Sequence, residues 1–379
     1  MDVPRTLLVT NDYPPRIGGI QRTLHALMGA LPPDRVHVFA SAGDGAASFD
    51  AGEPYPIARS SRPFVWPTPV ARRRIHDIVK ESGAEVVLFG DAMPLASLGP
   101  GLARAGTPYL VAAHGFDYWL SLVPGAHAWL RRATARASRV PVMCSAFIAR
   151  VVRTAVPDPV PVSVLYPGAD VERFRPDVPS ERIRQRHDLA GRPLVVCVSR
   201  LVPRKGQDVL IRAMPEIRRR VPDAALLLVG EGSYRPALEA MAARSSPGSV
   251  VFAGAASEQD LPSYYRAGDV FAMPCRTRLG GLEVEGWGNV FIEAAACGRP
   301  VVVGDSGGAR EAVVDGETGL LVDGSDVGAV AEAVASLLED PGRAEAMGSA
   351  GRARVERDHA WPAIAERLTR WLRAAVDGV

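Results

Sequence analysis

Residues 193–221 read PLVVCVSRLVPRKGQDVLIRAMPEIRRRV, and this stretch decides the fold. It opens with an apolar run of strand length, PLVVCVSR (193–200). A polar loop follows, and from Asp208 to Val221 the apolar residues recur at helical spacing. A buried strand that leads through a short loop into an amphipathic helix is the repeating unit of a parallel sheet covered by helices.

The same unit recurs on both sides of this stretch. Strands are predicted upstream at 6–9, 36–40, 85–90, 109–115, 140–145 and 162–166, and downstream at 225–230, 250–254, 270–274, 300–304 and 319–323. Helices are predicted at about 20–31, 68–82, 92–105, 126–138 and 145–154, at a capping-box-like start at Ser257, and from Asp326 to the end. The alternation predicts an α/β protein.

The length points to more than one domain, because a chain of 379 residues exceeds what one hydrophobic core supports. The segment 166–180 is rich in proline and polar residues and reads as a linker. We therefore expect two doubly wound, Rossmann-like domains, 1–170 and 171–360, that face a central cleft. Ligands of such sheets bind at the carboxyl ends of the strands.

The composition is that of an ordinary soluble protein, with 47% apolar and 23% charged residues. No apolar stretch approaches the ~18 residues that span a bilayer, and no signal peptide is visible. A net charge of +2 argues against a nucleic-acid partner. Four cysteines are isolated in sequence, which favours reduced thiols and a cytoplasmic location: Cys144, Cys197, Cys275 and Cys297.

One segment of the first half suggests contact with an anionic membrane surface. Up to Arg175 the chain has 19 Lys and Arg against 14 Asp and Glu. Residues 69–81 form an amphipathic pattern whose basic side carries Arg72, Arg73, Arg74 and Lys80. Such a helix can lie on the inner face of the cell membrane as a peripheral anchor. Equally, its apolar side can face the domain's own sheet and its arginines can be a solvated rim.

The loop 199–206 carries the strongest signal for an anion site. Arg200 and Lys205 lie between a strand and a helix N-terminus, where backbone N–H groups also point at a ligand. Lys205 is one of only two lysines among 44 basic residues. In a chain that otherwise uses arginine, this lysine suggests a need for a compact ammonium. A solvated charged loop is the alternative.

A second loop, EGWGNVFIEAAACGRP (285–300), places two carboxylates around a helix start. Glu285 precedes the helix expected near Asn289, and Glu293 lies one turn inside it. The N–H groups of Asn289 and Val290 could then meet a phosphate, while the carboxylates accept hydrogen bonds from sugar hydroxyls. A pair of ordinary surface glutamates is the alternative.

Two further motifs follow strands of the first half. Gly18 and Gly19, in NDYPPRIGGIQ (11–21), let the backbone approach an anion where the first helix begins, although a plain strand-to-helix turn fits them equally well. His114, in AHGFDYW (113–119), follows a buried strand and so lies at the carboxyl edge of a sheet. A lone histidine at such a place is more often structural than catalytic.

Together these motifs resemble the retaining glycosyltransferases of family four, which have the two-domain GT-B fold. The resemblance covers essentially the whole chain. The two glutamates separated by seven residues, Arg200 with Lys205, the glycine pair, the AHG strand end and the segment PGADVERFRP occur in the family's order. The stretches 11–21 and 275–294 are most similar to the mannosyltransferases of phosphatidylinositol mannoside assembly, of the PimB type.

The resemblance implies an α-mannosyltransferase that uses GDP-mannose, a glycolipid acceptor and no metal. The chain also lacks the Asp-x-Asp motif of metal-dependent transferases. It implies a final helix, 361–379, that packs back on the first domain. The catalytic set it implies is His114, Glu285, Arg200 and Lys205. For the donor diphosphate it implies Gly18, Gly19, Arg200, Lys205, Asn289 and Val290, for the ribose Glu293, and for the acceptor Asp12 and Tyr118.

A different transferase is the main competing hypothesis. A UDP-sugar-dependent enzyme with a soluble or natural-product acceptor fits the same fold, because the base-recognition segment 250–261 does not dictate guanine over uracil. A hydrolase or epimerase of nucleotide sugars is expected to lack the Arg–Lys and Glu–Glu combination. A non-catalytic sugar-binding protein is the remaining alternative.

Overall fold

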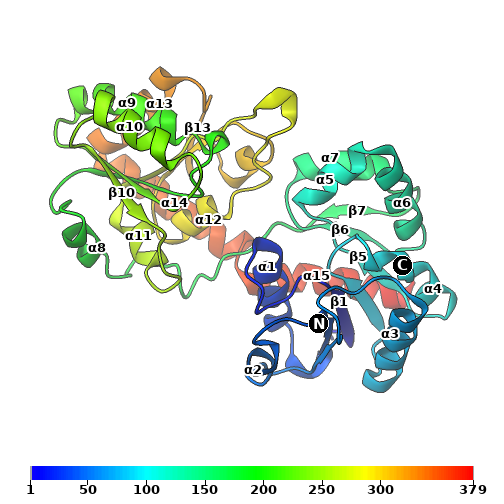
Figure 1. Ribbon diagram of the computed structural model, residues 1–379. Coiled ribbons are helices and arrows are strands. Elements are labelled where there is room, and N and C mark those ends of the chain that lie inside the picture. The colour runs from blue at the N-terminus through cyan, green and yellow to red at the C-terminus, as the bar shows by residue number, and fades with distance from the viewer. Residues whose placement is uncertain (1, 379) are drawn as a thin grey trace. The chain divides into compact units, whose positions relative to one another are not determined.

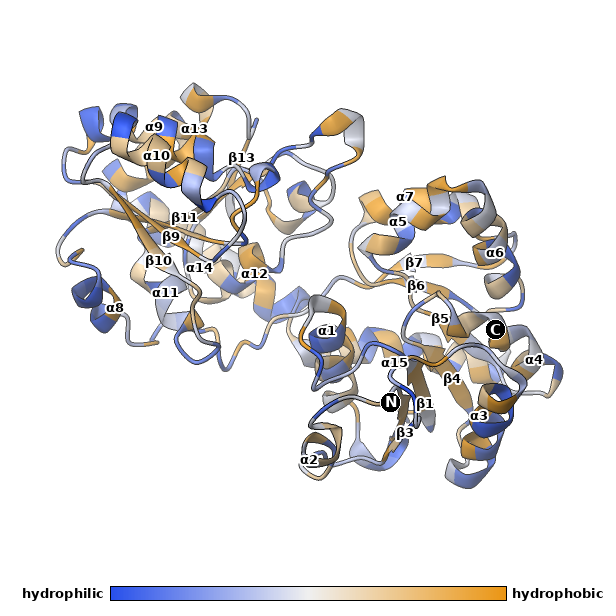
Figure 2. Cartoon of the chain, in the orientation of Figure 1, coloured by the Kyte–Doolittle hydropathy of each residue, from blue (hydrophilic) through white to orange (hydrophobic). Residues whose placement is uncertain are grey.

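The computed structural model describes residues 2–378. The chain divides into two compact units, Met1–Pro167 with Trp361–Val379, and Gly168–Ala360. Each unit is built on its own parallel sheet (Figure 1). Figure 2 shows apolar residues along the strands of both sheets, as expected for strands covered on both faces.

Unit 1 holds a five-stranded parallel sheet in the order β3-β2-β1-β4-β5. Its strands are β1 (Thr6–Thr10), β2 (Val36–Ala40), β3 (Ile57–Arg59), β4 (Val86–Phe89) and β5 (Tyr109–Val111). A parallel pair, β6 (Val140–Val142) and β7 (Val162–Val164), extends it through bridges from β5. The strand order reverses between β1 and β4, so the loops that follow these two strands flank the switch point.

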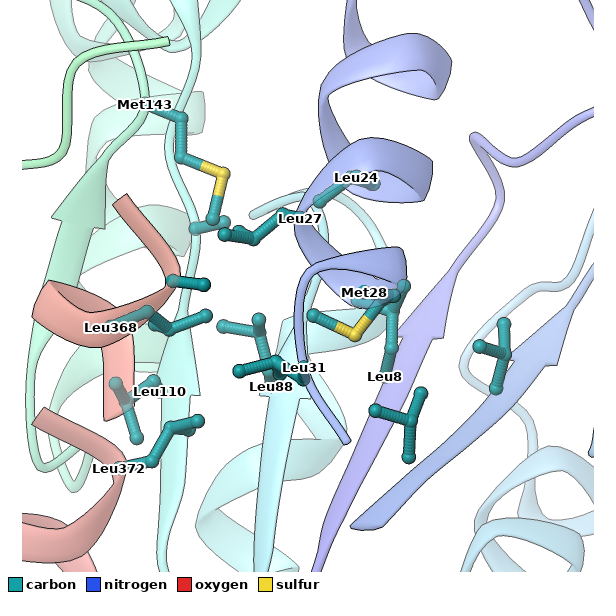
Figure 3. Packing of buried hydrophobic residues seen from close by; sticks show 14 of the residues in the cluster. Leu8, Leu24, Leu27, Met28, Leu31, Leu88, Leu110, Met143, Leu368 and Leu372 are labelled. Atoms are coloured by element: carbon teal, nitrogen blue, oxygen red, sulfur yellow. The ribbon is translucent and has the colours of Figure 1, made fainter. Parts of the chain in front are cut away.

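The helices of unit 1 cover this sheet. They are α1 (Gly19–Gly29), α2 (Ala46–Asp50), α3 (Pro69–Ser82), α4 (Gly99–Arg104), α5 (Gly115–Leu122), α6 (Pro124–Thr134), α7 (Ala146–Ala155) and the C-terminal α15 (Trp361–Asp377). Leu368 and Leu372 of α15 join Leu27 of α1 and Leu88 of β4 in one buried cluster (Figure 3). The end of the chain therefore completes the core of unit 1 (Figure 1).

Unit 2 holds a six-stranded parallel sheet in the order β10-β9-β8-β11-β12-β13. Its strands are β8 (Leu194–Val198), β9 (Ala225–Val229), β10 (Val250–Gly254), β11 (Val270–Met273), β12 (Val301–Gly304) and β13 (Gly319–Val322). Its helices are α8 (Glu181–Arg186), α9 (Gln207–Arg220), α10 (Arg235–Ser245), α11 (Leu261–Ala267), α12 (Asn289–Ala296), α13 (Val327–Glu339) and α14 (Pro341–Asp358). Its strand order reverses between β8 and β11.

Several sequence expectations were wrong in detail. The segment 92–105 is not one helix, because prolines and glycines divide it into a 3₁₀ turn, Leu95–Leu98, and α4. The helix placed at 126–138 begins at Pro124 and ends at Thr134. The helix placed at Ser257 begins at Leu261, although the Ser257 hydroxyl does accept a hydrogen bond from the Asp260 N–H. The short elements β3, α2, α5 and α8 were not expected, since their apolar patterns span too few residues.

The segment read as a linker is instead packed onto unit 2. The Ala169 N–H donates to the carbonyl oxygen of His359 at 2.8 Å, and the Phe174 side chain is buried against Tyr265. The Arg352 guanidinium donates to the carbonyl oxygens of Val171 and Phe174. Proline-rich composition therefore marked an irregular but ordered stretch here, held by hydrogen bonds that the sequence does not reveal.

Candidate active site

The anion-site loops of unit 2 meet at the switch point of its sheet. Lys205 follows β8 and Glu285 lies in the loop between β11 and α12, so two distant segments converge at neighbouring strand ends. Gly206 makes this approach feasible. Its φ is +78°, and a Cβ there would lie 2.0 Å from the carbonyl oxygen of Pro274 at the end of β11. Only glycine fits this position.

A buried carboxylate holds two cations in this site. One oxygen of Glu285 (Oε2) accepts from Lys205 Nζ at 2.6 Å and from Arg204 Nη1 at 2.5 Å. Glu285 is itself held by its backbone, since its N–H donates to the Ser306 hydroxyl and its carbonyl accepts from the Gly308 N–H. Glu285 thus orients both cations from a fixed position.

The charges in this cluster favour the ionised form of Glu285. Burial by itself would raise the pKa of the carboxyl, but Lys205 and Arg204 outweigh it and hold the pKa below its usual value. The cluster of one carboxylate and two cations carries net positive charge. It can therefore accept an anionic ligand without changing protonation.

Arg200 lies apart from this ion pair on the same loop. Its side chain is exposed, and no hydrogen bond or ion pair joins its guanidinium to any described residue. Its carbonyl oxygen accepts from the buried Gln207 side chain, which fixes the backbone of the loop. The guanidinium is therefore available to a ligand.

The start of α12 supplies N–H donors beside the cations. Gly288 caps the helix with a φ of +87°, so the N–H groups of Asn289 and Val290 belong to the free first turn. Glu293 lies one turn further, where its Oε2 accepts from the Tyr265 hydroxyl at 2.6 Å. In unit 2 the structure therefore gathers Lys205, Glu285 and the start of α12 at the sheet's carboxyl edge.

In unit 1, His114 is a buried side chain that caps a helix. Its Nε2 lies 2.7 Å from the carbonyl oxygen of Gly90, so Nε2 carries the proton of the neutral ring. Its backbone N–H donates to the Asp117 carboxylate at 2.6 Å. Burial lowers the pKa of His114, so the imidazole is neutral at pH 7.

A buried acidic group, Asp91, lies next to this histidine. Its Oδ2 accepts from the Thr10 hydroxyl at 2.9 Å and from the Asn11 N–H at 3.3 Å. Its Oδ1 is buried and finds no donor among residues 2–378. Burial raises the pKa of Asp91 to about 7, and the negative charges of Asp12 and Asp117 act in the same direction. Burial also raises the pKa of Asp117, to about 6, so the Asp91 pKa is the higher of the two.

The remaining predicted residues of unit 1 surround the same sheet edge. Asp12 accepts from the Gln21 side chain at 2.6 Å. Tyr118 stacks on Phe147 at a centroid distance of 5.9 Å. Gly18 caps α1 with an extended φ of 175°, and a Cβ on Gly19 would meet nothing within 4 Å. Neither glycine is therefore required by its own backbone conformation, although a Cβ on Gly18 would lie 2.1 Å from the Gln21 side-chain oxygen.

The apolar side of α3 faces its own domain, which is one of the two alternatives that the sequence left open. Ile75 and Ile78 are buried within unit 1, whereas the apolar side chain of Val70 is 78% exposed. The apolar side of the helix therefore packs against its own domain. Its outer face is basic, with exposed side chains at Arg72, Arg73, Arg74 and Lys80.

Residues 2–378 contain no candidate for a membrane-spanning helix and no candidate metal-binding cluster. No helix in this range is long and apolar enough to cross a membrane. No group of three or more His, Cys, Asp or Glu side chains in it is arranged to hold a metal ion.

Comparison with known families accounts for both halves of the chain. Residues 17–173 match the model described as Glycosyltransferase Family 4, and residues 179–354 match Glycosyl transferases group 1. A GDP-mannose-dependent alpha-(1-6)-phosphatidylinositol monomannoside mannosyltransferase of Mycolicibacterium smegmatis is 47% identical over 91% of this chain and 92% of its own. The chain belongs to glycosyltransferase family 4.

Another curated relative and two solved structures are also similar to this glycosyltransferase. The monoacylated alpha-(1-6)-phosphatidylinositol monomannoside mannosyltransferase of Corynebacterium glutamicum is 41% identical over 98% of both chains. Among solved structures, Anabaena HepE in complex with UDP superposes with a TM-score of 0.80 at 20% identity, covering 98% of this chain and all of its own. Sucrose-phosphate synthase of Thermosynechococcus elongatus gives 0.76 at 23% identity, covering 99% and 100%. The GT-B fold expected from the sequence is confirmed.

Sequence reasoning missed three groups of the site. Arg204 and Lys205 both donate to Glu285. The position of Arg204 directly before Lys205 in the loop was the feature of the sequence that could have indicated its role. Tyr265 holds Glu293, and Asp91 lies buried beside His114. Nothing local in the sequence marks Tyr265 or Asp91, because each acquires its partners only through the sheet.

Proposed function

We propose that this glycosyltransferase moves mannose from GDP-mannose to a phosphatidylinositol monomannoside, with retention at the anomeric carbon. The observation that carries the proposal is the Glu285–Lys205–Arg204 cluster at the switch point of unit 2. The relatives with 41–47% identity, which are named for this donor and acceptor, support it.

The chemistry follows from the charges. As the glycosidic bond of the donor breaks, negative charge grows on the leaving diphosphate. Lys205, Arg204, Arg200 and the first N–H groups of α12 stabilise that charge, and they favour the transition state because the charge is largest there. The leaving phosphate can itself take the proton of the attacking hydroxyl. Glu285 then serves as the anchor of the cations and a contact of the mannose, and Glu293 as the acceptor for ribose hydroxyls.

We propose that no metal is needed, because fixed cations supply the charge that a metal would otherwise bring to the diphosphate. In unit 1 we propose that Asp12 and Tyr118 serve the acceptor side and that His114 lies near the reacting sugar. A neutral His114 donates through Nε2 to Gly90 and takes part with Asp117 in the capping box of α5, so its ring is held in one orientation. The roles of Gly18 and Gly19 at the diphosphate stay a prediction.

Transfer assays test the donor, the acceptor and the metal together. The purified enzyme is incubated with radiolabelled GDP-mannose or UDP-glucose and with either phosphatidylinositol monomannoside or a water-soluble mannoside, in buffer with EDTA. We expect a dimannosylated lipid with GDP-mannose only, at a rate that added Mg²⁺ does not raise. Transfer from UDP-glucose alone, or to a soluble acceptor alone, would overturn the assignment. A rate that requires Mg²⁺ would overturn the metal-free mechanism.

We also propose that the basic face of α3 binds an anionic membrane surface, where a lipid acceptor resides. Because Ile75 and Ile78 are buried, charge rather than insertion should supply the binding, at about 1 kcal/mol per basic residue near the surface. The effect should therefore weaken with salt.

Vesicle sedimentation measures this binding. At low salt the native enzyme should sediment with vesicles that contain anionic lipid, and a variant with Arg72, Arg73 and Arg74 changed to serine should stay largely in the supernatant. A native enzyme that stays in the supernatant would refute membrane binding, and equal sedimentation of both proteins would refute the site on α3.

A further inference from the structure

Unit 2 contains a large pocket at the end of its sheet opposite to the Glu285 cluster. Its volume is about 790 Å³, within the range of sites for small molecules. It lies at the amino ends of the strands, since its lining includes Pro193, just before β8, Asp269, just before β11, and Pro300, just before β12. The proposed mechanism makes no use of this pocket.

The pocket is lined by more arginines than its carboxylates neutralise. Five arginines line it: Arg184, Arg192, Arg266, Arg299 and Arg352. Two of the three carboxylates on its wall are already paired, Asp269 with Arg184 at 2.8 Å and Glu356 with Arg352 at 2.6 Å. The third, Glu345, has no ion pair with another described residue. The wall therefore keeps a surplus of positive charge.

Two of these arginines have unused donors. The Arg266 guanidinium has no hydrogen bond or ion pair with any residue in 2–378, and the Nε of Arg299 is buried without an acceptor in the same range. Arg299 lies beside Arg266, because its Nη2 donates to the Arg266 carbonyl oxygen at 2.7 Å. Arg266 is half-buried and open to an anionic ligand, whereas the Arg299 Nε is closed to solvent and would meet a ligand only after the side chain moves.

The polar groups on the wall define the ligand class. Arginine pairs are suited to the oxygens of a phosphate group, to which they donate several hydrogen bonds. Glu345 and Ser349, also on the wall, suit hydroxyl groups rather than a second phosphate. We propose that this pocket binds a small phosphorylated polyol, such as a sugar phosphate, with its phosphate on Arg266 and Arg299.

The pocket shares structural elements with the donor site. Arg266 directly follows Tyr265, whose hydroxyl holds Glu293. The other end of α12, the helix that carries Glu293, is held by Arg352, which donates to the Ala296 carbonyl oxygen at 2.9 Å. A ligand whose phosphate lies on Arg266 therefore contacts the residue next to Tyr265, in a pocket whose wall also includes Arg352. We infer that the pocket is regulatory and that a ligand bound in it changes the enzyme's affinity for GDP. By linkage, bound GDP changes the affinity of the pocket for its ligand by the same factor.

Calorimetry with the donor site filled tests the proposal. The enzyme, saturated with GDP, is titrated with glucose 6-phosphate and separately with inorganic phosphate. We expect saturable binding of one glucose 6-phosphate per chain, tighter than that of phosphate. Arg266→Ala should weaken it at least tenfold, with GDP binding retained as the evidence of folding. Arg343→Ala removes an exposed arginine of α14 outside the pocket and should leave it unchanged.

Three other results would each contradict a part of the proposal. Equal affinity for phosphate and glucose 6-phosphate would refute the polyol part and leave a plain anion site. Binding that disappears when GDP is present, or that Arg266→Ala does not weaken, would overturn the pocket as the site. A GDP dissociation constant that is the same with and without glucose 6-phosphate would overturn the coupling.

Discussion

Replacing Lys205 with alanine should lower kcat by roughly 100- to 1000-fold at saturating donor, the usual cost of losing one group that stabilises transition-state charge. Its ammonium lies 2.6 Å from Glu285 and faces the position proposed for the leaving diphosphate. Arg200→Ala should also reduce turnover sharply, because no described residue competes for its guanidinium. Steady-state rates with GDP-mannose and the lipid acceptor measure both effects.

Controls separate charge stabilisation from folding. Lys205→Arg should not restore the rate, because a guanidinium does not fit the place of an ammonium that is only 8% exposed. Arg244→Ala, an exposed arginine of α10, should have the native rate. Glu285→Gln should also lose activity, since it removes the anchor of both cations. Near-native rates in Lys205→Ala and Arg200→Ala would refute their assignment to the diphosphate.

Changing Asp91 to asparagine should stabilise unit 1 at neutral and alkaline pH. Burial raises the pKa of Asp91 to about 7 in the folded protein, whereas an unfolded aspartate has a pKa near 3.9. The folded state then binds more protons between these values, so the stability that Asp91 contributes falls as the pH rises from about 4 to about 7. Between pH 5 and pH 8 this loss amounts to about 3 kcal/mol, at about 1.4 kcal/mol per pH unit below the folded pKa.

Urea unfolding of both proteins at pH 5 and pH 8 measures this difference. As the pH rises, the free energy of unfolding of the Asp91→Asn variant should increase relative to that of the native protein. The other buried titrating groups, Asp117 and His114, are present in both proteins, so their contributions largely cancel in the comparison. Asp44→Asn, at an exposed aspartate, should show no such gain. An equal pH dependence in Asp91→Asn and native protein would mean that Asp91 is ionised throughout.

The sequence by itself determined the fold class and part of the proposed donor site. Strands 36–40 and 250–254 were predicted with the bounds that β2 and β10 have, because the strands of a helix-covered parallel sheet are short runs rich in apolar residues. The loop residues Lys205 and Glu285 were found because catalytic groups of such sheets follow strand ends, which local patterns reveal. The family order of the motifs then gave the transferase class.

Only the tertiary structure determined which side chains are in contact and which helix faces are exposed to solvent. Arg204 and Tyr265 joined the site, and Asp91 acquired a raised pKa, because strands far apart in sequence lie side by side in the sheets. Burial of Ile75 and Ile78 turned an apparently amphipathic helix into one whose free face is basic. Periodicity shows that a helix has an apolar side, but it cannot show what covers that side. Desolvation, hydrogen-bond partners and surface charge all depend on this covering, so they followed only from the packed structure.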